Sequence, residues 1–138
     1  VPDCVSREFY RHILDHESTG VFQGKVVVRQ HAQKTDGAMK SQALVLGDDA
    51  SMNNKPELEI FADDVVCGHG ATVGRLDENQ IFYLRTRGLS RGEAESLLLE
   101  AFANEALDMV ADEAVRARYA SQTADWLAHR SGVTGSGQ

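Results

Sequence analysis

A cysteine and a histidine two positions apart, Cys67 and His69, are the residues in this chain whose types and spacing best suit chemistry. Side chains two apart on an extended strand point to the same face, so the pair would present a thiol and an imidazole side by side. Thiolate sulfur and imidazole nitrogen are ligands for zinc and for iron–sulfur clusters. The flanking glycines Gly68 and Gly70 would leave room for a bulky partner or a second backbone. The sequence therefore predicts a candidate metal or cluster site here.

Two other interpretations of Cys67 remain open at this stage. Free cysteines are usually small buried hydrophobic side chains. In a straight strand Val65 and Val73 would share the face of Cys67, which favours an interior position. A neighbouring imidazole can also activate a thiol, so a catalytic dyad of Cys67 and His69 is conceivable. The sequence gives no sign of the third, orienting group that such a dyad needs.

Length and composition limit the class of protein. The chain has 138 residues, enough for one domain with a hydrophobic core, and a formal net charge of −7. That charge argues against a general nucleic-acid binder, and no apolar run approaches the roughly 20 residues of a membrane span. Two cysteines, Cys4 and Cys67, make no disulfide framework, which favours a reducing compartment. Because the chain starts at Val1 without an initiator methionine, we expect a piece of a longer protein in preference to a processed product.

Short apolar segments separated by turn residues fill the chain up to about Gly88. No helical pattern lies between them, so a doubly wound sheet is not expected. The segments recur at intervals of roughly 20 residues, which favours the coils of a β-solenoid. A small antiparallel sandwich fits the pattern nearly as well. The predicted strands are 20–30 (with Phe22, Val26 and Val28 on one face), 42–46, 57–61, 65–73 and 80–84, and the predicted turns are 35–37, 47–49, 52–56 and 77–79.

The periodicity becomes helical after Gly88. Ser90 with Glu93 three positions later is a capping box that predicts the start of a helix. The apolar stripe of this helix comprises Ala94, Leu97, Leu98, Ala101, Phe102 and Met109. A second helix is predicted from about Asp112 to His129, with Val115, Tyr119 and Trp126 on one side. Residues 131–138 are predicted to form a flexible tail.

Other common catalytic motifs are missing from the sequence. The segment 70–74 is rich in glycine, but no lysine follows it, so it is not a phosphate-binding loop. Without a Cys-x-x-Cys pair, the chain alone cannot supply a four-thiolate cluster site. The adjacent acids at 48–49 and 63–64 are interpreted as turn residues. His12 and His16 lie four apart and could share the face of a helix, where we interpret them as solvated.

A set of motifs carries a more specific signal than any of these patterns. The motifs are KTDG (34–37), QALVLGD (42–48), PELEI (56–60), ADDV (62–65), CGHGATVG (67–74), IFYL (81–84) and RG (87–88). In this order and spacing they resemble the SufB/SufD family of the SUF iron–sulfur cluster assembly machinery, over roughly residues 5 to 110. The SufB branch is similar at 81–88 but less similar at 69–74, so the chain resembles the SufD branch more closely.

The resemblance implies a fold and a division into domains. Family members have a right-handed parallel β-helix core followed by a carboxy-terminal helical domain. We therefore expect a mainly β fold with α-helices: carboxy-terminal coils of the β-helix in residues 1–88, a helical domain in 89–130 and a flexible tail in 131–138. The family proteins are far longer than this chain. A shortened solenoid leaves an unpaired coil face, so we expect the fragment to self-associate through that face or through its pairing edge.

The resemblance also implies partners and a role. A SufD-like subunit pairs with a SufB-like subunit and docks a SufC-like ATPase through its helical domain, and it acts as a scaffold without being an enzyme. It binds no ATP itself. Cys67 and His69 match a functional Cys-x-His of the family, which implies a transient iron–sulfur cluster shared with the partner subunit. No nucleic acid or membrane partner is expected, and the bacterial cytoplasm is the expected compartment, with the plastid as the alternative.

The helical region supplies the expected contacts with the ATPase. Candidate contact residues are Arg85, Arg87, Arg91, Asn104, Glu105 and Asp108. Two rival functions remain. One is a pure interaction module that never touches metal, and the other is a β-solenoid enzyme or carbohydrate-binding domain with Cys67 as nucleophile.

Overall fold

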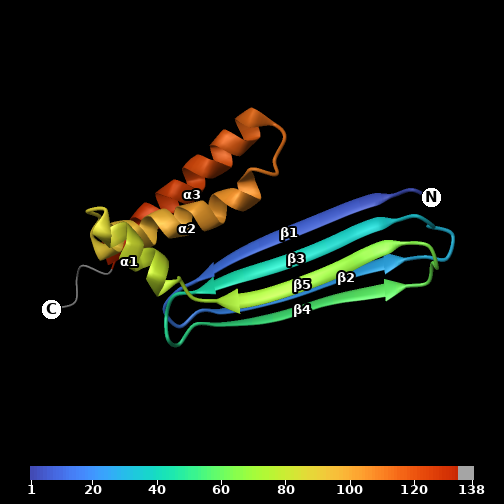
Figure 1. Cartoon of the computed structure of the whole chain (residues 1–138), viewed down its shortest axis with the longest axis horizontal. Helices are drawn as coiled ribbons and strands as arrows, with labels where there is room; N and C mark the ends of the chain where they lie inside the picture. Colours follow the sequence, from blue (N-terminus) through green and yellow to red (C-terminus); the bar gives the residue numbers. More distant parts are fainter. Residues whose placement is uncertain (134–138) are drawn as a thin grey trace. The chain divides into compact units, whose positions relative to one another are not determined.

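Five strands followed by three helices make up the part of the chain that the computed structural model describes, residues 1–133 (Figure 1). The chain divides into two units, and the second unit begins at Leu76. The elements are β1 (Val5–Leu14), β2 (Thr19–Val28), β3 (Asp36–Val45), β4 (Ser51–Ile60), β5 (Val66–Gly74), α1 (Glu78–Thr86), α2 (Arg91–Leu107) and α3 (Glu113–Val133). A β region followed by helices was predicted, and this order is confirmed.

The strand unit consists of two parallel sheets between which the chain alternates. One sheet has the order β1-β3-β5, and the other pairs β2 with β4. Strands of one sheet run opposite to those of the other, so the chain goes out along one layer and returns along the second (Figure 1). Each strand thus pairs with the strand two before it in the chain, as Asp36 does with Val5 and Ser51 with Thr19. The structural repeat therefore contains two strands, and the interval of roughly 20 residues between repeats that was expected from the sequence is wrong. The antiparallel sandwich is also wrong, because all of these pairings are parallel.

The interior of this unit lies between the two sheets. Alternate residues of β3, from Gly37 to Val45, are buried, and their neighbours on the same strand are more exposed. Met39 is the largest of these side chains and is 2% exposed. Gly24 of β2 gives it room, because a Cβ at Gly24 would stand 2.8 Å from the Met39 sulfur. Glycine is thus required inside the strand unit for close packing, although it weakens a strand elsewhere.

The alternation in β2 was readable from the sequence, whereas β1 and the first half of β4 were not. Phe22, Val26 and Val28 share the inward face of β2, as predicted. β1 was missed, since its inward positions include polar residues such as Glu8 and His12. The segment 52–56 was predicted as a turn but lies within β4, where its asparagines and proline pair with β2. The helical face expected for His12 and His16 is wrong as well, because His12 lies on a strand.

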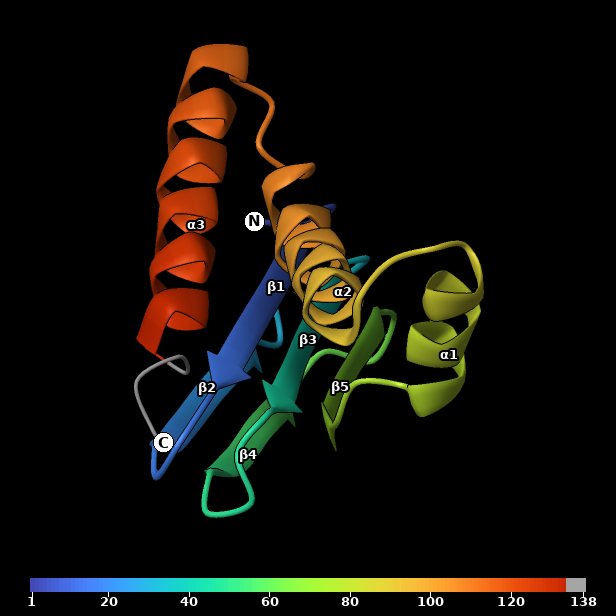
Figure 2. The same cartoon turned by 90° about the vertical axis from the view of Figure 1, so that its left-hand side faces the viewer.

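Side chains cap the starts of α1 and α2 in the second unit. The Asp77 side chain accepts a hydrogen bond from the backbone N–H of Asn79 and caps α1. The predicted capping box is confirmed at α2, where Ser90 and Glu93 exchange side-chain and backbone hydrogen bonds. α3 lies beside α2 (Figure 2). The buried side chains of this unit are Ile81 of α1, Ala94 and Leu99 of α2, and Leu127 of α3.

Three details of the helical region differ from the predictions. The segment 80–84 was predicted as a strand from its β-forming residues, but it belongs to α1, where Asp77 supplies the cap. Leu97 is 47% exposed, whereas Leu99 is fully buried, so the apolar stripe faces a different direction from the one predicted. α3 extends to Val133, and residues 134–138 of the predicted tail lie outside the described residues.

Within residues 1–133, no helix has the length and apolar character needed to cross a membrane.

Candidate functional site

Cys67 and His69 both lie on β5, and the pairing of that strand fixes the face they share. Cys67 is opposite Gly37 and His69 is opposite Met39 on β3. Directly paired residues point to the same side of a parallel sheet, so both side chains are on the inward face that Met39 defines. Their Cα atoms are about 6.6 Å apart at the usual rise of a strand. Both could therefore reach one metal ion or cluster.

The two side chains lie on an edge strand and differ in exposure. Cys67 is half-buried, whereas His69 is exposed. Among the described strands β5 has one neighbour, β3, so its other edge is open. An open edge presents unpaired backbone N–H and C=O groups to another chain. The candidate ligands thus lie at a border of the sheet where a second protein can approach.

Glycines keep the surroundings of this pair clear. A Cβ placed at Gly68, Gly70 or Gly74 would meet no heavy atom within 4 Å. On β5 the chain therefore presents backbone where most strands present side chains. This open space is consistent with room for a partner beside the glycines. No side chain from Gly68 or Gly70 stands next to the imidazole of His69 on this strand.

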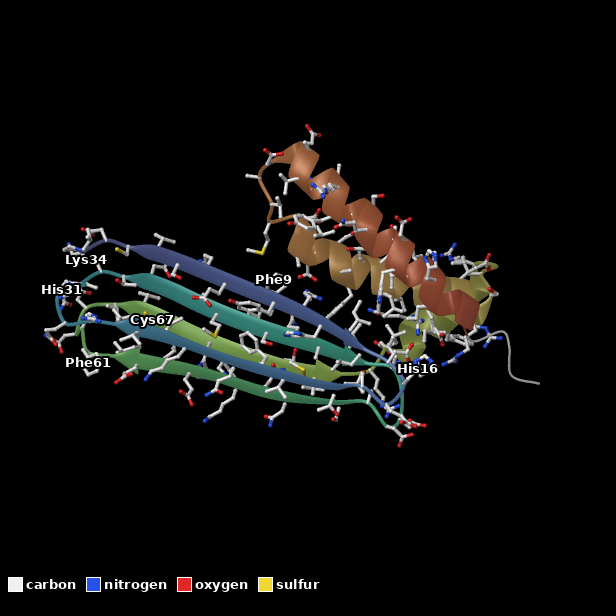
Figure 3. The ribbon with its side chains drawn as sticks, turned by 180° about the vertical axis from the view of Figure 1, so that it is seen from behind. Phe9, His16, His31, Lys34, Phe61 and Cys67 are labelled. Atoms are coloured by element: carbon white, nitrogen blue, oxygen red, sulfur yellow. The ribbon has the colours of Figure 1, made fainter. Side chains whose placement is uncertain are left out.

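The Cys67 sulfur lies close to β3. Its Sγ is 4.0 Å from the carbonyl oxygen of Thr35, to which the thiol donates a weak hydrogen bond. Cys67 lies toward the end of the sheets where the turn that carries His31 and Lys34 is found (Figure 3). Both cysteines are free thiols, and the exposed Cys4 donates to the carbonyl oxygen of Val1 at 3.0 Å.

The described residues do not complete a metal site by themselves. Within residues 1–133, no group of three or more His, Cys, Asp or Glu side chains is arranged to hold a metal ion. Cys67 and His69 supply one sulfur and one nitrogen, and an iron–sulfur cluster requires more ligands than two. Their chemistry fits a cluster only if another molecule supplies the rest.

Arg91 and Arg87, two of the expected contacts with an ATPase, already have partners in the helical unit. Arg91 donates two hydrogen bonds to the Glu78 carboxylate, at 3.0 and 2.7 Å, and pairs with Glu95 at 2.8 Å. The hydrogen bonds from Arg91 lower the pKa of Glu78. Arg87 donates to the Tyr83 hydroxyl at 3.0 Å and lies over its ring. Arg91 therefore ties α1 to the start of α2, and Arg87 makes its contacts within the region of α1.

The remaining candidates lie at the two helix ends. Arg85 is exposed in the last turn of α1, where a cation favours the helix dipole. Asp108 caps α2, its backbone N–H bonded to the carbonyl of Asn104 at 2.8 Å. Glu105 and Asp108 are exposed, and Asn104 is half-buried. The three arginines thus lie around the end of α1 and the start of α2, whereas Asn104, Glu105 and Asp108 lie at the end of α2.

An apolar groove between α1 and α2 was not predicted from the sequence. It has a volume of about 460 Å³. Its lining residues are Asn79, Gln80, Tyr83, Leu84, Leu97, Leu98 and Ala101. Leu97 was predicted in the apolar stripe of the helix, but it is exposed and lines this groove.

Sequence reasoning also missed a hydrogen-bonded cluster inside the strand unit. The Ser41 hydroxyl, which is fully buried, donates to Asn54 Oδ1 at 2.7 Å. His12 Nε2 lies 3.3 Å from the same hydroxyl oxygen, within hydrogen-bond distance. Burial lowers the pKa of His12. Polar residues at the inward positions of β1, β3 and β4 were the available signal, but they concealed β1 and the first halves of β3 and β4.

The sequence of most of this chain matches one known family. A model of the SufBD core domain of SUF-system FeS cluster assembly matches residues 1–102, which include all five strands and most of α2. The chain belongs to the SufB/SufD family of iron–sulfur cluster assembly proteins. The resemblance described from its motifs is thus confirmed.

Individual relatives favour the SufD branch. The chain is similar to the iron–sulfur cluster assembly protein SufD of Escherichia coli, with 46% identity over 113 residues, 82% of this chain and 27% of that protein. A SufBD family protein of Synechocystis is 44% identical over 109 residues, 79% of this chain and 24% of its own length. The chloroplastic protein ABCI7 of Arabidopsis thaliana is 36% identical over 116 residues, 83% of this chain and 24% of its own. The chain spans about a quarter of the length of these relatives.

Proposed function

We propose that this chain is the carboxy-terminal part of a SufD-like scaffold subunit, on which an iron–sulfur cluster is assembled together with other proteins. The cluster is cargo that is built and passed on, and the chain itself catalyses no reaction and binds no ATP. Its membership in the SufB/SufD family and its similarity to SufD support this role.

The proposal includes a finer description of the fold. The five strands are the last coils of a right-handed parallel β-helix, and the helices form the carboxy-terminal domain of the subunit. Parallel pairing of each strand with the strand two before it in the chain supports this description, because each coil of a β-helix stacks on the previous one in this way.

The position of Cys67 and His69 on the open edge strand β5 is the observation that carries the proposal. Both side chains share one face, and a second chain can approach that edge. In this assembly a SufB-like partner pairs beside β5 and supplies the ligands that the chain lacks. Both ligands bind iron only when deprotonated, so cluster retention would weaken in acid.

The helical unit is proposed to dock a SufC-like ATPase. The groove lined by Tyr83, Leu97 and their neighbours supports this assignment, because exposed apolar surface commonly marks an interaction site. Arg85, Arg87, Arg91, Asn104, Glu105 and Asp108 are proposed to form the polar surroundings of that contact. Without its partners the chain is proposed to self-associate through an open strand edge. Its bacterial and chloroplastic relatives support the bacterial cytoplasm or the plastid as the compartment.

A binding experiment with matched variants tests the site. The chain, its His69→Ala form and its His31→Ala form are each purified in complex with a SufB-like subunit and a SufC-like ATPase, and bound iron and sulfide are measured. His31 is an exposed turn residue that lies on neither β3 nor β5, so its substitution is the control. We expect all three complexes to form and only the His69→Ala complex to lose iron and sulfide.

The other outcomes separate the alternatives. Equal iron retention by all three complexes would contradict the cluster site and favour a pure interaction module. Failure of every form to bind the partners would contradict the scaffold role itself. Rapid labelling of Cys67 by electrophiles in the free chain, well above the rate of an ordinary thiol, would favour the nucleophile alternative.

A further inference from the structure

The Cys67 sulfur lies against a buried glycine in the interior of the strand unit. Gly37 of β3 is buried, faces inward and is paired directly with Cys67. A Cβ at Gly37 would stand 3.2 Å from Cys67 Sγ, closer than carbon and sulfur ordinarily approach. The next nearest atom is Thr35 Cγ2, at 4.0 Å. The sulfur of Cys67 is thus the closest neighbour of the missing side chain.

Several other glycines of the strand unit make room for methionine, leucine, phenylalanine or backbone atoms, whereas at Gly37 the nearest atom is the Cys67 sulfur. A Cβ at Gly20 or Gly24 would crowd a methionine sulfur and other apolar atoms at 2.7 to 3.1 Å. A Cβ at Gly47 would stand 2.5 Å from the backbone carbonyl oxygen of His16. At Gly37 no large apolar side chain fills the space, and a buried strand position there would ordinarily favour a larger residue.

We infer that Gly37 is a positioning residue for Cys67. Its missing side chain lets the sulfur lie against β3, on the face that Cys67 shares with His69. An alanine at this position would push the sulfur away from β3, toward the open edge of β5, by a few tenths of an ångström. Gly37 thus sets the position of the sulfur from which the Cys67 thiolate and the His69 imidazole bind one cluster. This role rests on the proposed cluster site.

The neighbouring peptide groups agree with this assignment. Thr35, two residues before Gly37, directs its carbonyl oxygen toward Cys67 Sγ at 4.0 Å. The Thr35 hydroxyl is itself bonded to the carbonyl of Ala32 at 2.8 Å, which holds this turn in place. The segment from Thr35 to Gly37 therefore forms the wall against which the sulfur rests.

The test compares two Gly→Ala substitutions near the same sulfur. In a Cys4→Ser background, so that Cys67 is the single thiol, the alkylation rate of Cys67 by iodoacetamide is measured for the parent, Gly37→Ala and Gly68→Ala chains. Gly68 adjoins Cys67 in sequence, but a Cβ there would meet nothing within 4 Å. We expect Gly37→Ala to raise the alkylation rate severalfold and Gly68→Ala to leave it unchanged. Equal rates in all three chains would overturn the inference.

A second measurement covers the case in which Gly37→Ala fails to fold. Thermal unfolding is compared for Gly37→Ala alone and for Gly37→Ala combined with Cys67→Ala. If the sulfur occupies the space, removing it restores the unfolding temperature toward that of Cys67→Ala. A double variant as unstable as the sum of its parts would overturn the inference.

Failure of this inference is distinguishable from failure of the proposed function. Alkylation and unfolding concern the free chain and need no cluster or partner. If Gly37→Ala alters the thiol but the His69→Ala complex keeps its iron, the cluster site is wrong and the packing relationship stands. If His69→Ala loses iron but Gly37→Ala behaves like the parent, the site stands and the positioning role of Gly37 is overturned.

Discussion

The buried hydroxyl of Ser41 donates a 2.7 Å hydrogen bond to Asn54 Oδ1 and thereby joins the two sheets of the strand unit. Ser41 lies on β3 and Asn54 on β4, and His12 of β1 completes the cluster. Since a buried polar group is costly when it lacks a partner, this cluster makes the stacking of the two sheets specific.

Replacing Ser41 should destabilise the strand unit. Ser41→Ala leaves Asn54 Oδ1 and His12 without their shared partner, and we expect a loss of about 1–3 kcal/mol in the free energy of unfolding. Urea denaturation measures the change. Ser121→Ala, on the exposed surface of α3, is a control expected to be close to neutral. A Ser41→Ala chain as stable as the parent would contradict the role of this cluster.

Stability should fall between pH 7 and pH 5 because of His12. Its pKa in the folded chain is lowered by burial below the ordinary value of 6.5, so folding favours the neutral imidazole. The stabilisation is complete above about 6.5 and is lost as the pH falls through the folded-state pKa. Ser41 and the ring of Phe22 face His12. The lowered pKa values of Asp36, Glu78 and Glu93, from ordinary values of 3.8, 4.5 and 4.5, have their effect at lower pH.

A variant without His12 isolates the contribution of this residue to the pH dependence of stability. Urea midpoints of the parent and of His12→Gln are compared at pH 7 and pH 5, and we expect the parent to lose more stability than the variant. Glutamine keeps a donor near Ser41 but does not titrate. The same decrease in both proteins would assign the pH dependence to other groups.

Leu99 should contribute far more to the helical unit than Leu97, two positions earlier. Leu99 is fully buried, and Leu99→Ala is expected to cost about 2–5 kcal/mol because it leaves a cavity. Leu97 is 47% exposed, and Leu97→Ala should cost much less. Thermal unfolding followed by circular dichroism distinguishes them. Equal losses would contradict the orientation of α2.

Removing the N-terminal cap of α2 should lower the stability of the helical unit, but by less than Leu99→Ala does. Ser90→Ala removes the acceptor of the Glu93 N–H and one half of the capping box. We expect a loss of about 0.5–2 kcal/mol, with partial recovery in Ser90→Asp, since aspartate is also a good cap. Amide hydrogen exchange in the first turn of α2 provides a local readout. Unchanged exchange in Ser90→Ala would show that the cap contributes nothing.

The sequence was informative where local signals agree with the fold and misleading where tertiary pairing overrides them. The capping box at Ser90 and the alternation of Phe22, Val26 and Val28 were both readable, since each depends on residues close together in the chain. Asn54 looks like a turn former, but pairing with β2 and the bond from Ser41 keep it in a strand. The intrinsic preference of a residue for a turn or a strand contributes less free energy than such pairing does.

The candidate pair itself was visible from residue type, but its orientation was not. The glycines of β5 remove the alternating pattern from which the direction of a side chain is normally inferred. Pairing of Cys67 with Gly37 and of His69 with Met39 supplies that direction, and these partners lie on β3, with the whole of β4 between them and β5 in the chain. The position of Gly37 next to the sulfur depends on the same pairing, so no local motif could have revealed it.

The spacing between paired strands also affects how fast the two units can form. Every pairing in the strand unit joins two strands that are separated in the chain by a third, so each new strand must close a long loop before its hydrogen bonds form. The helices form from contacts within each turn, and loop closure of this size is not required for them. We therefore expect the helical unit to acquire its structure first, and β5, which carries Cys67 and His69, to be ordered only once β3 is available as its template.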